Sequence, residues 1–284
     1  MTARPNNSTA STASFTPVQL EPVRVSTIGK IYESEWFSYI PTIVGIFVLW
    51  YLATDVFGVP AYLIPRPVDV FSAMYTHWPL LLRETLATLR EILGGFAIAV
   101  ATAVPLALMI VYSRVFERFV NPVIIISQAI PKVAIAPLFL VWFGFGEFPK
   151  MLIAALIAFF PMLIACTVGL KGIDPEMLSM ARSMGATPSR TFFKLRLPIA
   201  LPNFFGGFKL AITFSVIGAV IGEFVGGDHG IGYLIQLASG SQQLDLLFAG
   251  LIVLSALSLI LFFSVEAIER KVCAWHPSQL TPTA

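Results

Sequence analysis

The stretch ILGGFAIAVATAVPLALMIVYS, which runs from Ile92 to Ser113, decides the fold class because it contains no Asp, Glu, Lys or Arg. About 20 apolar residues cross the hydrocarbon core of a bilayer as one helix. Three further charge-free runs have a similar length: Trp36–Thr54, Met151–Leu170 and Leu246–Val265. The sequence therefore predicts at least four membrane-spanning helices.

Two more apolar stretches, Phe119–Gly146 and Leu197–Gly222, are long enough to span but contain prolines and one lysine each, Lys132 and Lys209. Neighbouring helices or a water-lined path can satisfy such interruptions. The chain as a whole is 57% hydrophobic and 12% charged, whereas soluble domains average roughly 25% charged residues. We therefore predict an all-α, polytopic transmembrane bundle with six spans.

Lysine and arginine outside the spans set the orientation, because cytoplasmic loops carry the excess of these residues. With the N-terminus inside, the outer segments hold Arg66, Arg83, Arg90 and Lys150. The cytoplasmic set is three times larger: Arg4, Arg24, Lys30, Arg114, Arg118, Lys171, Arg182, Arg190, Lys194, Arg196, Arg270 and Lys271. Both termini are therefore predicted to be cytoplasmic.

The predicted organisation has three parts. Residues 1–35 are rich in Ser, Thr and Pro and lack the apolar region of a signal peptide, which predicts a disordered or surface-lying cytoplasmic tail. Residues 36–275 form the transmembrane domain, with a basic cytoplasmic loop at 171–200. Residues 276–284 form a second cytoplasmic tail.

The cytoplasmic loop reads as two short helices joined by a glycine hinge. Asp174 followed by a proline is a helix start, and Gly185 is placed to end that helix as a left-handed cap. Thr187 and Pro188 repeat the start signal, and Pro198 is expected to turn the chain towards the membrane. From shape alone the loop is either a protein-docking site or an amphipathic helix pair held by lipid headgroups.

The third predicted span carries the strongest signal for a translocation pathway. Pro131 and Pro137 each remove a backbone donor near its middle, with Gln128 and Lys132 close by. Lys132 is interpreted as a pathway cation for an anionic substrate or as part of a structural ion pair with Glu223. Glu223 itself is interpreted as a gate residue or as a residue at the outer interface.

Two other charges inside predicted helices are interpreted as structural. Lys209 is expected to extend its ammonium to the membrane interface from a helix end. Arg90 is expected to be a packing-related charge with Glu91 nearby.

Other function classes find little support in the residues. The three histidines, His77, His229 and His276, are scattered, and no Ser/His/Asp set or metal-ligand cluster is apparent. No G-x-x-x-x-G-K-[ST] loop that could hold nucleotide phosphates is present. We therefore predict that the chain is not an enzyme and binds no cofactor, and no selectivity stretch indicates a channel.

The loop resembles the coupling motif of permeases from binding-protein-dependent ABC importers, in which Glu-Ala-Ala, a glycine and a distant Ile-x-Leu-Pro recur. The resemblance implies ATPase-coupling residues at Ser179, Met180, Ala181, Gly185, Ala186, Leu195, Leu197 and Pro198. Ser179 and Met180 depart from the usual Glu and Ala, and Leu195 replaces Ile.

Further motifs resemble the permeases of nitrate, taurine and aliphatic sulfonate importers over about Tyr39 to Trp275. They are LIPRP (Leu63–Pro67), TLREILGGF (Thr88–Phe96), IPKVAIAPL with WFGFG (Ile130–Gly146), GEF (Gly222–Phe224) and GIG (Gly230–Gly232). The resemblance implies a type I ABC importer permease-like fold in a bacterial inner membrane. The predicted pathway residues remain Gln128, Pro131, Lys132, Pro137 and Glu223.

The resemblance also implies the partners. A second copy of the chain, two separate ATPase subunits that hold ATP and Mg²⁺, a periplasmic or lipid-anchored binding protein and membrane lipid are expected, and no nucleic acid. The implied cargo is a small, anionic solute of the nitrate, sulfonate or taurine kind. The alternative is a neutral or aromatic cargo, such as a pyrimidine vitamin precursor, riboflavin or a phthalate-like acid.

Overall fold

The computed structural model describes residues 35–275, and every secondary-structure element in that part of the chain is a helix. The predictions for the N-terminal tail, apart from residue 35, and for the tail 276–284 lie outside the described residues. The chain divides into two units, Met1–Ile46 and Phe47–Ala284. The fold described below is that of the second unit.

The first predicted span corresponds to helix α2 (Glu35–Tyr51), which crosses the unit boundary and continues as a π-helical turn, η1 (Leu52–Val56). Its described apolar part, Val44–Val56, is shorter than a membrane span. The span Trp36–Thr54 therefore stays a prediction.

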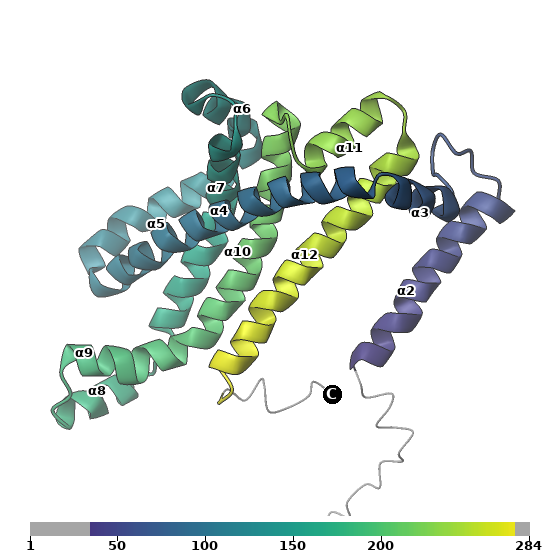
Figure 1. Cartoon of the computed structure of the whole chain (residues 1–284). Coiled ribbons are helices and arrows are strands. Elements are labelled where there is room, and N and C mark those ends of the chain that lie inside the picture. The colour runs from purple at the N-terminus through teal and green to yellow at the C-terminus, as the bar shows by residue number, and fades with distance from the viewer. Residues whose placement is uncertain (1–34, 276–284) are drawn as a thin grey trace, which may run out of the picture. The chain divides into compact units, whose positions relative to one another are not determined.

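Four helices of the second unit are long and apolar enough to cross a membrane (Figure 1). Each contains one of the predicted spans, which confirms that those sequences form helices of membrane-crossing length. The four are α4 (Trp78–Tyr112), α7 (Glu147–Lys171), the continuous helix Pro188–Gly226 that ends with α10 (Leu197–Gly226), and α12 (Leu244–Val272).

Helix α4 begins well before the charge-free run that predicted it. Its 35 residues give a length of about 52 Å at 1.5 Å per residue, against about 30 Å for the hydrocarbon core. The sequence-based boundary at Ile92 was too late because charged residues precede it. The structure buries two of them, Glu84 and Glu91, between helices.

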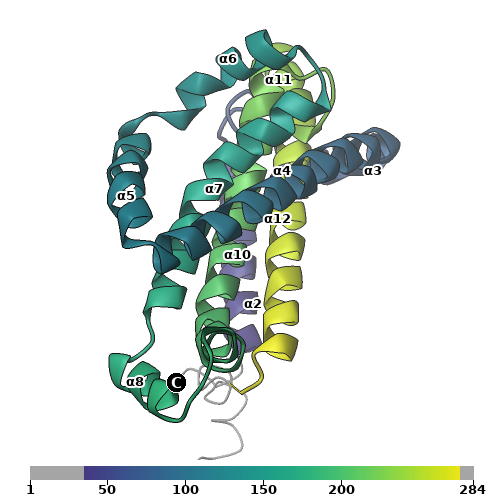
Figure 2. The same cartoon turned by 90° about the vertical axis from the view of Figure 1, so that its left-hand side faces the viewer.

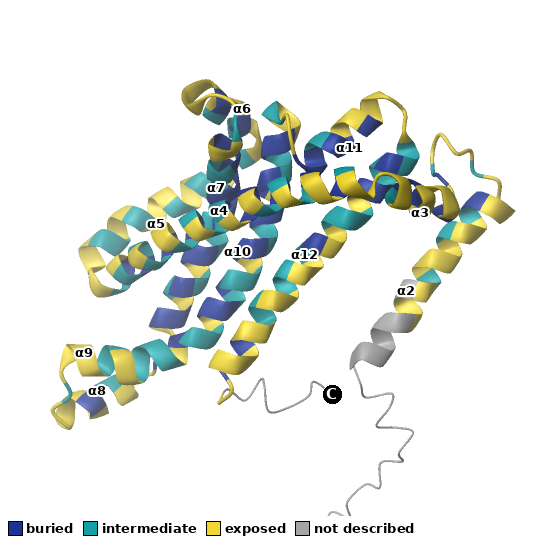
Figure 3. Ribbon diagram, in the orientation of Figure 1, coloured by how far each residue is buried: buried dark blue, intermediate teal, exposed yellow. Residues whose placement is uncertain are grey.

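The bundle packs around α7, against which both α4 and α10 lie closely. A Cβ atom added to Gly218 of α10 would fall 2.5 Å from the Cα of Ala154, and Gly95 of α4 approaches the same alanine from another side. Small residues at these positions let the three backbones come together, as in other membrane helix pairs. Figure 3 shows the buried residues concentrated on α7 and α10.

The third predicted span does not run straight. It consists of α5 (Arg114–Ala129) and α6 (Lys132–Phe143), which meet at an angle of 97°. Ile130 is extended (φ −77°, ψ 125°), since a following proline disfavours the helical conformation. By length and composition the unit therefore has four spans, or five if this bent pair counts as one.

The remaining helices are short and lie at the ends of the unit. Helices α8 (Pro175–Ser183) and α9 (Pro188–Thr191) lie at one end, whereas α6 and α11 (Ile231–Gly240) lie at the opposite end (Figures 1 and 2). Helix α3 (Pro67–Thr76) precedes α4.

Candidate functional site

The helix pair α8–α9 forms as the capping residues predict. The Asp174 carboxylate accepts a hydrogen bond from the Glu176 amide (2.9 Å), and the Thr187 hydroxyl accepts one from the Arg190 amide (3.4 Å). Gly185 has φ +74°, a conformation that side chains other than glycine seldom adopt. The Ala186 amide donates to the Ala181 carbonyl (3.0 Å), which closes the end of α8.

One stripe of the exposed surface of α8 and its C-terminal end is formed by methionines. Met177, Met180 and Met184 are 43%, 64% and 77% exposed, and their spacing places them along one side of the helix. Ala181 points inward and is buried. The Ser179 hydroxyl donates to the Glu176 carbonyl (2.8 Å), so it is occupied within its own helix.

The second half of the loop differs from the prediction. Pro198 was expected to turn the chain, but the helix is continuous from Pro188 to Gly226. A π-helical turn, η2 (Phe192–Arg196), precedes α10, and its wider winding is a common way for a helix to absorb an irregularity. Leu195, Leu197 and Pro198 are half-buried there.

Four of the five predicted pathway residues lie along the bent third span, and the fifth, Glu223, is buried in α10. Gln128, Pro131 and Pro137 are exposed, and Lys132 is half-buried. The Lys132 ammonium lies 5.1 Å from the centre of the Phe160 ring, a cation–π distance. The structure contradicts the alternative interpretation of an ion pair between Lys132 and Glu223. The Glu223 carboxylate is hydrogen-bonded to Thr88 and Gly232 instead.

A buried ionic cluster lies at the end of the bundle opposite α8. Lys150, near the start of α7, is 1% exposed, and its ammonium is 2.8 Å from the Glu91 carboxylate of α4. The same ammonium donates to the His229 carbonyl (3.1 Å) and lies 3.8 Å from Asp228. A buried lysine is tolerated only with partners of this kind.

Carboxylates from α4 and α10 bind the start of α11. The Glu223 carboxylate accepts from the Thr88 hydroxyl (2.6 Å) and from the Gly232 amide (2.5 Å). The Gly230 amide donates to Glu84 (2.7 Å), and the Ile231 amide donates to the Thr88 hydroxyl (2.8 Å). Three otherwise unpaired amides of a helix start are thereby satisfied, with negative charge at its positive end.

Sequence reasoning missed most of this cluster. It placed Lys150 in an outer loop and paired Glu91 with Arg90, whereas Arg90 lies 3.9 Å from Glu147. One signal was available: Glu84, Thr88 and Glu91 are spaced to share a face of α4. That face is buried in the structure.

Lys209 also differs from its interpretation as a residue at a helix end. It lies inside α10, and its ammonium is 2.7 Å from the largely buried Glu269 carboxylate of α12. The pair therefore joins two spans.

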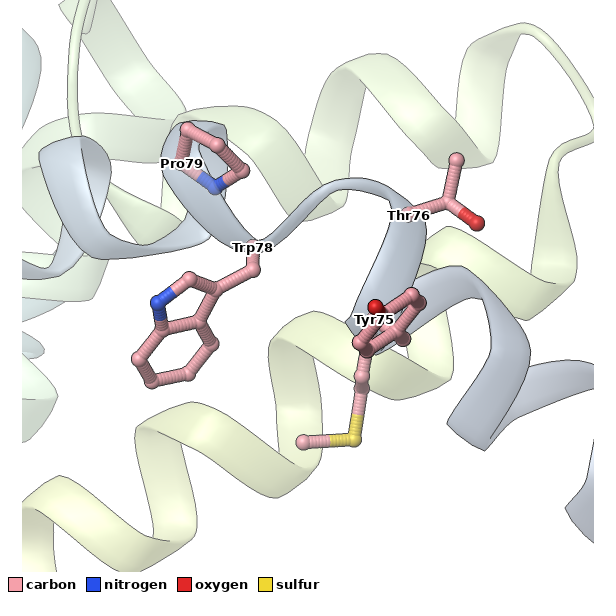
Figure 4. Close-up of a pocket in the computed structure, with 5 residues that line it drawn as sticks. Tyr75, Thr76, Trp78 and Pro79 are labelled. Carbon is pink, nitrogen blue, oxygen red and sulfur yellow. The ribbon is translucent and has the colours of Figure 1, made fainter.

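A surface hollow of about 860 Å³ lies at the turn between α3 and α4 (Figure 4). Met74, Tyr75, Thr76, Trp78 and Pro79 line it. All five come from one turn, and none belongs to the predicted pathway or coupling sets. Within residues 35–275 no cluster of three or more metal-ligating side chains is found.

The structure is that of a polytopic, helical membrane protein with a permease-like fold. It contains apolar helices of membrane-crossing length, the sharply bent helix pair α5–α6 and the capped helix pair α8–α9 at one end. Residues 95–273 match the family described as "Binding-protein-dependent transport system inner membrane component", and the chain belongs to this family. It is thus a multi-pass inner-membrane permease of a binding-protein-dependent ABC importer, a transport subunit without a cofactor of its own. Permeases of this family work with ATPase subunits and binding proteins.

Relatives with assigned names agree on the transport role but differ in cargo. A probable ABC transporter permease of Haemophilus influenzae is 39% identical over 79% of this chain and 92% of its own length. The riboflavin transport system permease RibX of Chloroflexus aurantiacus is 37% identical over 84% of this chain and 89% of its own. The formylaminopyrimidine transport permease ThiX of Halalkalibacterium halodurans is 31% identical over 82% of this chain and 93% of its own length.

The fold is similar to that of solved ABC importers. The MetNI methionine ABC transporter, in an inward-facing conformation, aligns with a TM-score of 0.60 over 69% of this chain and 98% of that chain. At 21% identity this similarity concerns the fold.

Proposed function

We propose that the loop 171–200 docks onto a separate ATPase subunit and couples ATP hydrolysis to import. The observation that carries the proposal is the capped pair α8–α9, with Gly185 left-handed in the register of the coupling motif. The methionine face of α8 supplies an adaptable apolar contact surface. It stands beside Ser179, where the motif usually has a glutamate.

The assembly proposed is a homodimer of this chain with two ATPase subunits and a periplasmic or lipid-anchored binding protein. Each copy crosses the membrane six times, with α2 as the first span and α5–α6 as the third, and both termini are cytoplasmic. Nucleotide-driven closure of the ATPases moves α8 and α9, and rigid-body movement of the spans then alternates access to the pathway. The bent third span with Gln128, Pro131, Lys132 and Pro137 lines that pathway.

The cargo best supported is a small heteroaromatic compound. Two relatives above 30% identity are named for riboflavin and formylaminopyrimidine transport. Aromatic side chains gather on the bent span, where Phe139 and Phe143 stack with ring centres 5.9 Å apart and Trp142 is 64% exposed. Such faces suit a flat, aromatic solute.

A small anion is the second candidate. Lys132 is a half-buried cation that contacts an aromatic ring rather than a carboxylate. In addition, a putative aliphatic sulfonates transport permease of Bacillus subtilis is 29% identical over 82% of this chain. The Lys132 cation and this relative together support a sulfonate as the second candidate cargo.

Reconstitution separates the two candidates. The chain is purified with its ATPase in lipid nanodiscs, and ATP hydrolysis is measured after adding the binding protein with riboflavin, a formylaminopyrimidine or taurine. Stimulation by the heteroaromatic compounds alone is expected. Stimulation by taurine alone would select the anionic class instead.

The docking role is tested with two variants at one position. Gly185→Val strains the left-handed cap, although a Cβ there would meet nothing within 4 Å, so any effect comes from the backbone. We expect Gly185→Val to lower uptake in one of two ways. Either the ATPase stays bound and hydrolyses ATP without transport, or the ATPase no longer purifies with the chain. Gly185→Asn tolerates the same conformation and should transport normally. Normal uptake by both variants would contradict the docking assignment.

A further inference from the structure

Two contacts join the docking loop to the region where α4 ends and α5 begins, one on each side of the loop. Lys171, the last residue of α7 before the loop, lies with its ammonium 2.5 Å from the Glu117 carboxylate in the first turn of α5. Both side chains are only partly exposed, at 41% and 31%. The ion pair therefore links the chain segment that leads into α8 with α5.

On the other side, the turn η2 holds the junction between α4 and α5. The Arg196 guanidinium lies 5.4 Å from the centre of the Tyr112 ring, a cation–π contact, and the Phe192 ring lies 6.2 Å from the same ring. Tyr112 is the last residue of α4, and the next residue, Ser113, caps α5 by accepting from the Phe116 amide (3.2 Å). A shift of η2 therefore moves the start of α5.

Helix α5 has few contacts with the rest of the described chain, and we therefore expect it to move as a rigid body. None of its residues is fully buried. It contacts the core along one stripe, formed by Phe116, Val120 and Ile124. In Figure 2, α5 and α6 lie along one side of α7, α10 and α12, and α6 reaches the end opposite α8. A movement at the start of α5 thus reaches the break at Pro131.

We propose that Glu117–Lys171 and Tyr112–Arg196 are the positioning contacts through which movement of the docking loop reaches the bent third span. This inference rests on the proposed docking function. It assigns the transmission to α5, because Glu117 lies in the first turn of α5 and Tyr112 is two residues before that helix begins. None of the four residues belongs to the predicted pathway or ATPase-coupling sets, so as positioning residues they are expected to act on the coupling between ATP hydrolysis and uptake.

The ion pair is tested by charge reversal. Glu117→Lys and Lys171→Glu each replace attraction by repulsion, and uptake per ATP hydrolysed is expected to fall by about fivefold or less, because ion pairs at partly exposed positions are weak. The double variant with both reversals restores the attraction and should recover the ratio. Glu266→Lys disrupts an ion pair within α12, with Arg270 at 2.7 Å, and should leave the ratio unchanged.

The aromatic contact is tested at Tyr112. Tyr112→Phe keeps the ring over which Arg196 lies and should couple normally, whereas Tyr112→Leu removes it and should lower uptake per ATP. All variants must retain the ATPase in stoichiometric amount on purification, which excludes loss of folding or docking as the cause.

The outcomes distinguish this inference from the proposed function. If Gly185→Val uncouples transport but the single reversals and Tyr112→Leu keep the normal ratio, the transmission through α5 is wrong and docking stands. If the single reversals lower the ratio and the double reversal fails to recover it, the ion pair is not the positioning contact. If Gly185→Val has no effect either, the docking assignment fails.

Discussion

Ala154 of α7 is a residue at which three helices of the bundle come close together. Gly95 of α4 and Gly218 of α10 both face it, so the distance between backbones depends on the absence of a side chain at each glycine. Lipid offers no hydrophobic driving force for helix association, and close packing of this kind therefore contributes much of the stability.

Gly218→Ala should destabilise the protein, because the added Cβ would lie 2.5 Å from the Cα of Ala154. Overpacking of a tight contact costs about 1–3 kcal/mol. Gly206→Ala is the matched control on the same helix, since nothing lies within 4 Å of a Cβ there. Thermal unfolding in detergent measures both, and equal midpoints for the two variants would contradict the packing argument.

Lys150→Met should be strongly destabilising, because it leaves the buried Glu91 carboxylate without its cation. Removing one partner of a buried pair costs about 3–5 kcal/mol. Adding Glu91→Gln to the same chain removes the unpaired charge and should recover part of the loss. The same unfolding measurement checks this. If Lys150→Met alone were as stable as the wild type, the Lys150–Glu91 pair would not contribute to stability.

At the scale of elements, the break between α5 and α6 depends on one proline. Pro131 sets the extended conformation of Ile130 and starts α6, whereas α6 continues through Pro137 without a comparable bend. Pro131 directly precedes α6 and disfavours the helical conformation of Ile130, where α5 ends, whereas Pro137 lies inside α6 and the helix continues through it despite the hydrogen bond that this proline removes.

Pro131→Ala should let α5 and α6 straighten in part, while Pro137→Ala should leave their angle unchanged. Spin labels on cysteines placed at the exposed positions Asn121 and Val141 report the change as a longer distance between the labels. Uptake should fall with Pro131→Ala, since the bent span is proposed to line the pathway. An unchanged distance would show that the surrounding helices, rather than the proline, impose the bend.

At the scale of the whole molecule, the two ends of the second unit differ in chemistry. One end presents the basic, methionine-faced helix pair α8–α9, and the other presents Asp228 and His229 above the buried Lys150 cluster. The excess of lysine and arginine predicts that the first end faces the cytoplasm.

This orientation predicts a labelling pattern in intact cells. A cysteine at His229 should react with a maleimide that cannot cross the membrane, and a cysteine at Ser189 should react only after permeabilisation. Both positions are exposed in the structure of this chain, and cells without the ATPase subunit are used so that docking does not protect Ser189. Reaction at Ser189 without permeabilisation would reverse the orientation.

What the sequence determined by itself is local. Hydropathy located four helices of membrane-crossing length, three of them from charge-free runs and the fourth from the run interrupted by Lys209. The pairs Asp174–Pro175 and Thr187–Pro188, with Gly185, located the helices of the loop, because hydropathy and capping act within a few residues. Only the tertiary structure decided the continuous helix through Pro198 and the partners of the buried charges. Lys150 meets Glu91 across 59 residues and Thr88 meets Glu223 across 135, and no local pattern encodes which distant helices come together.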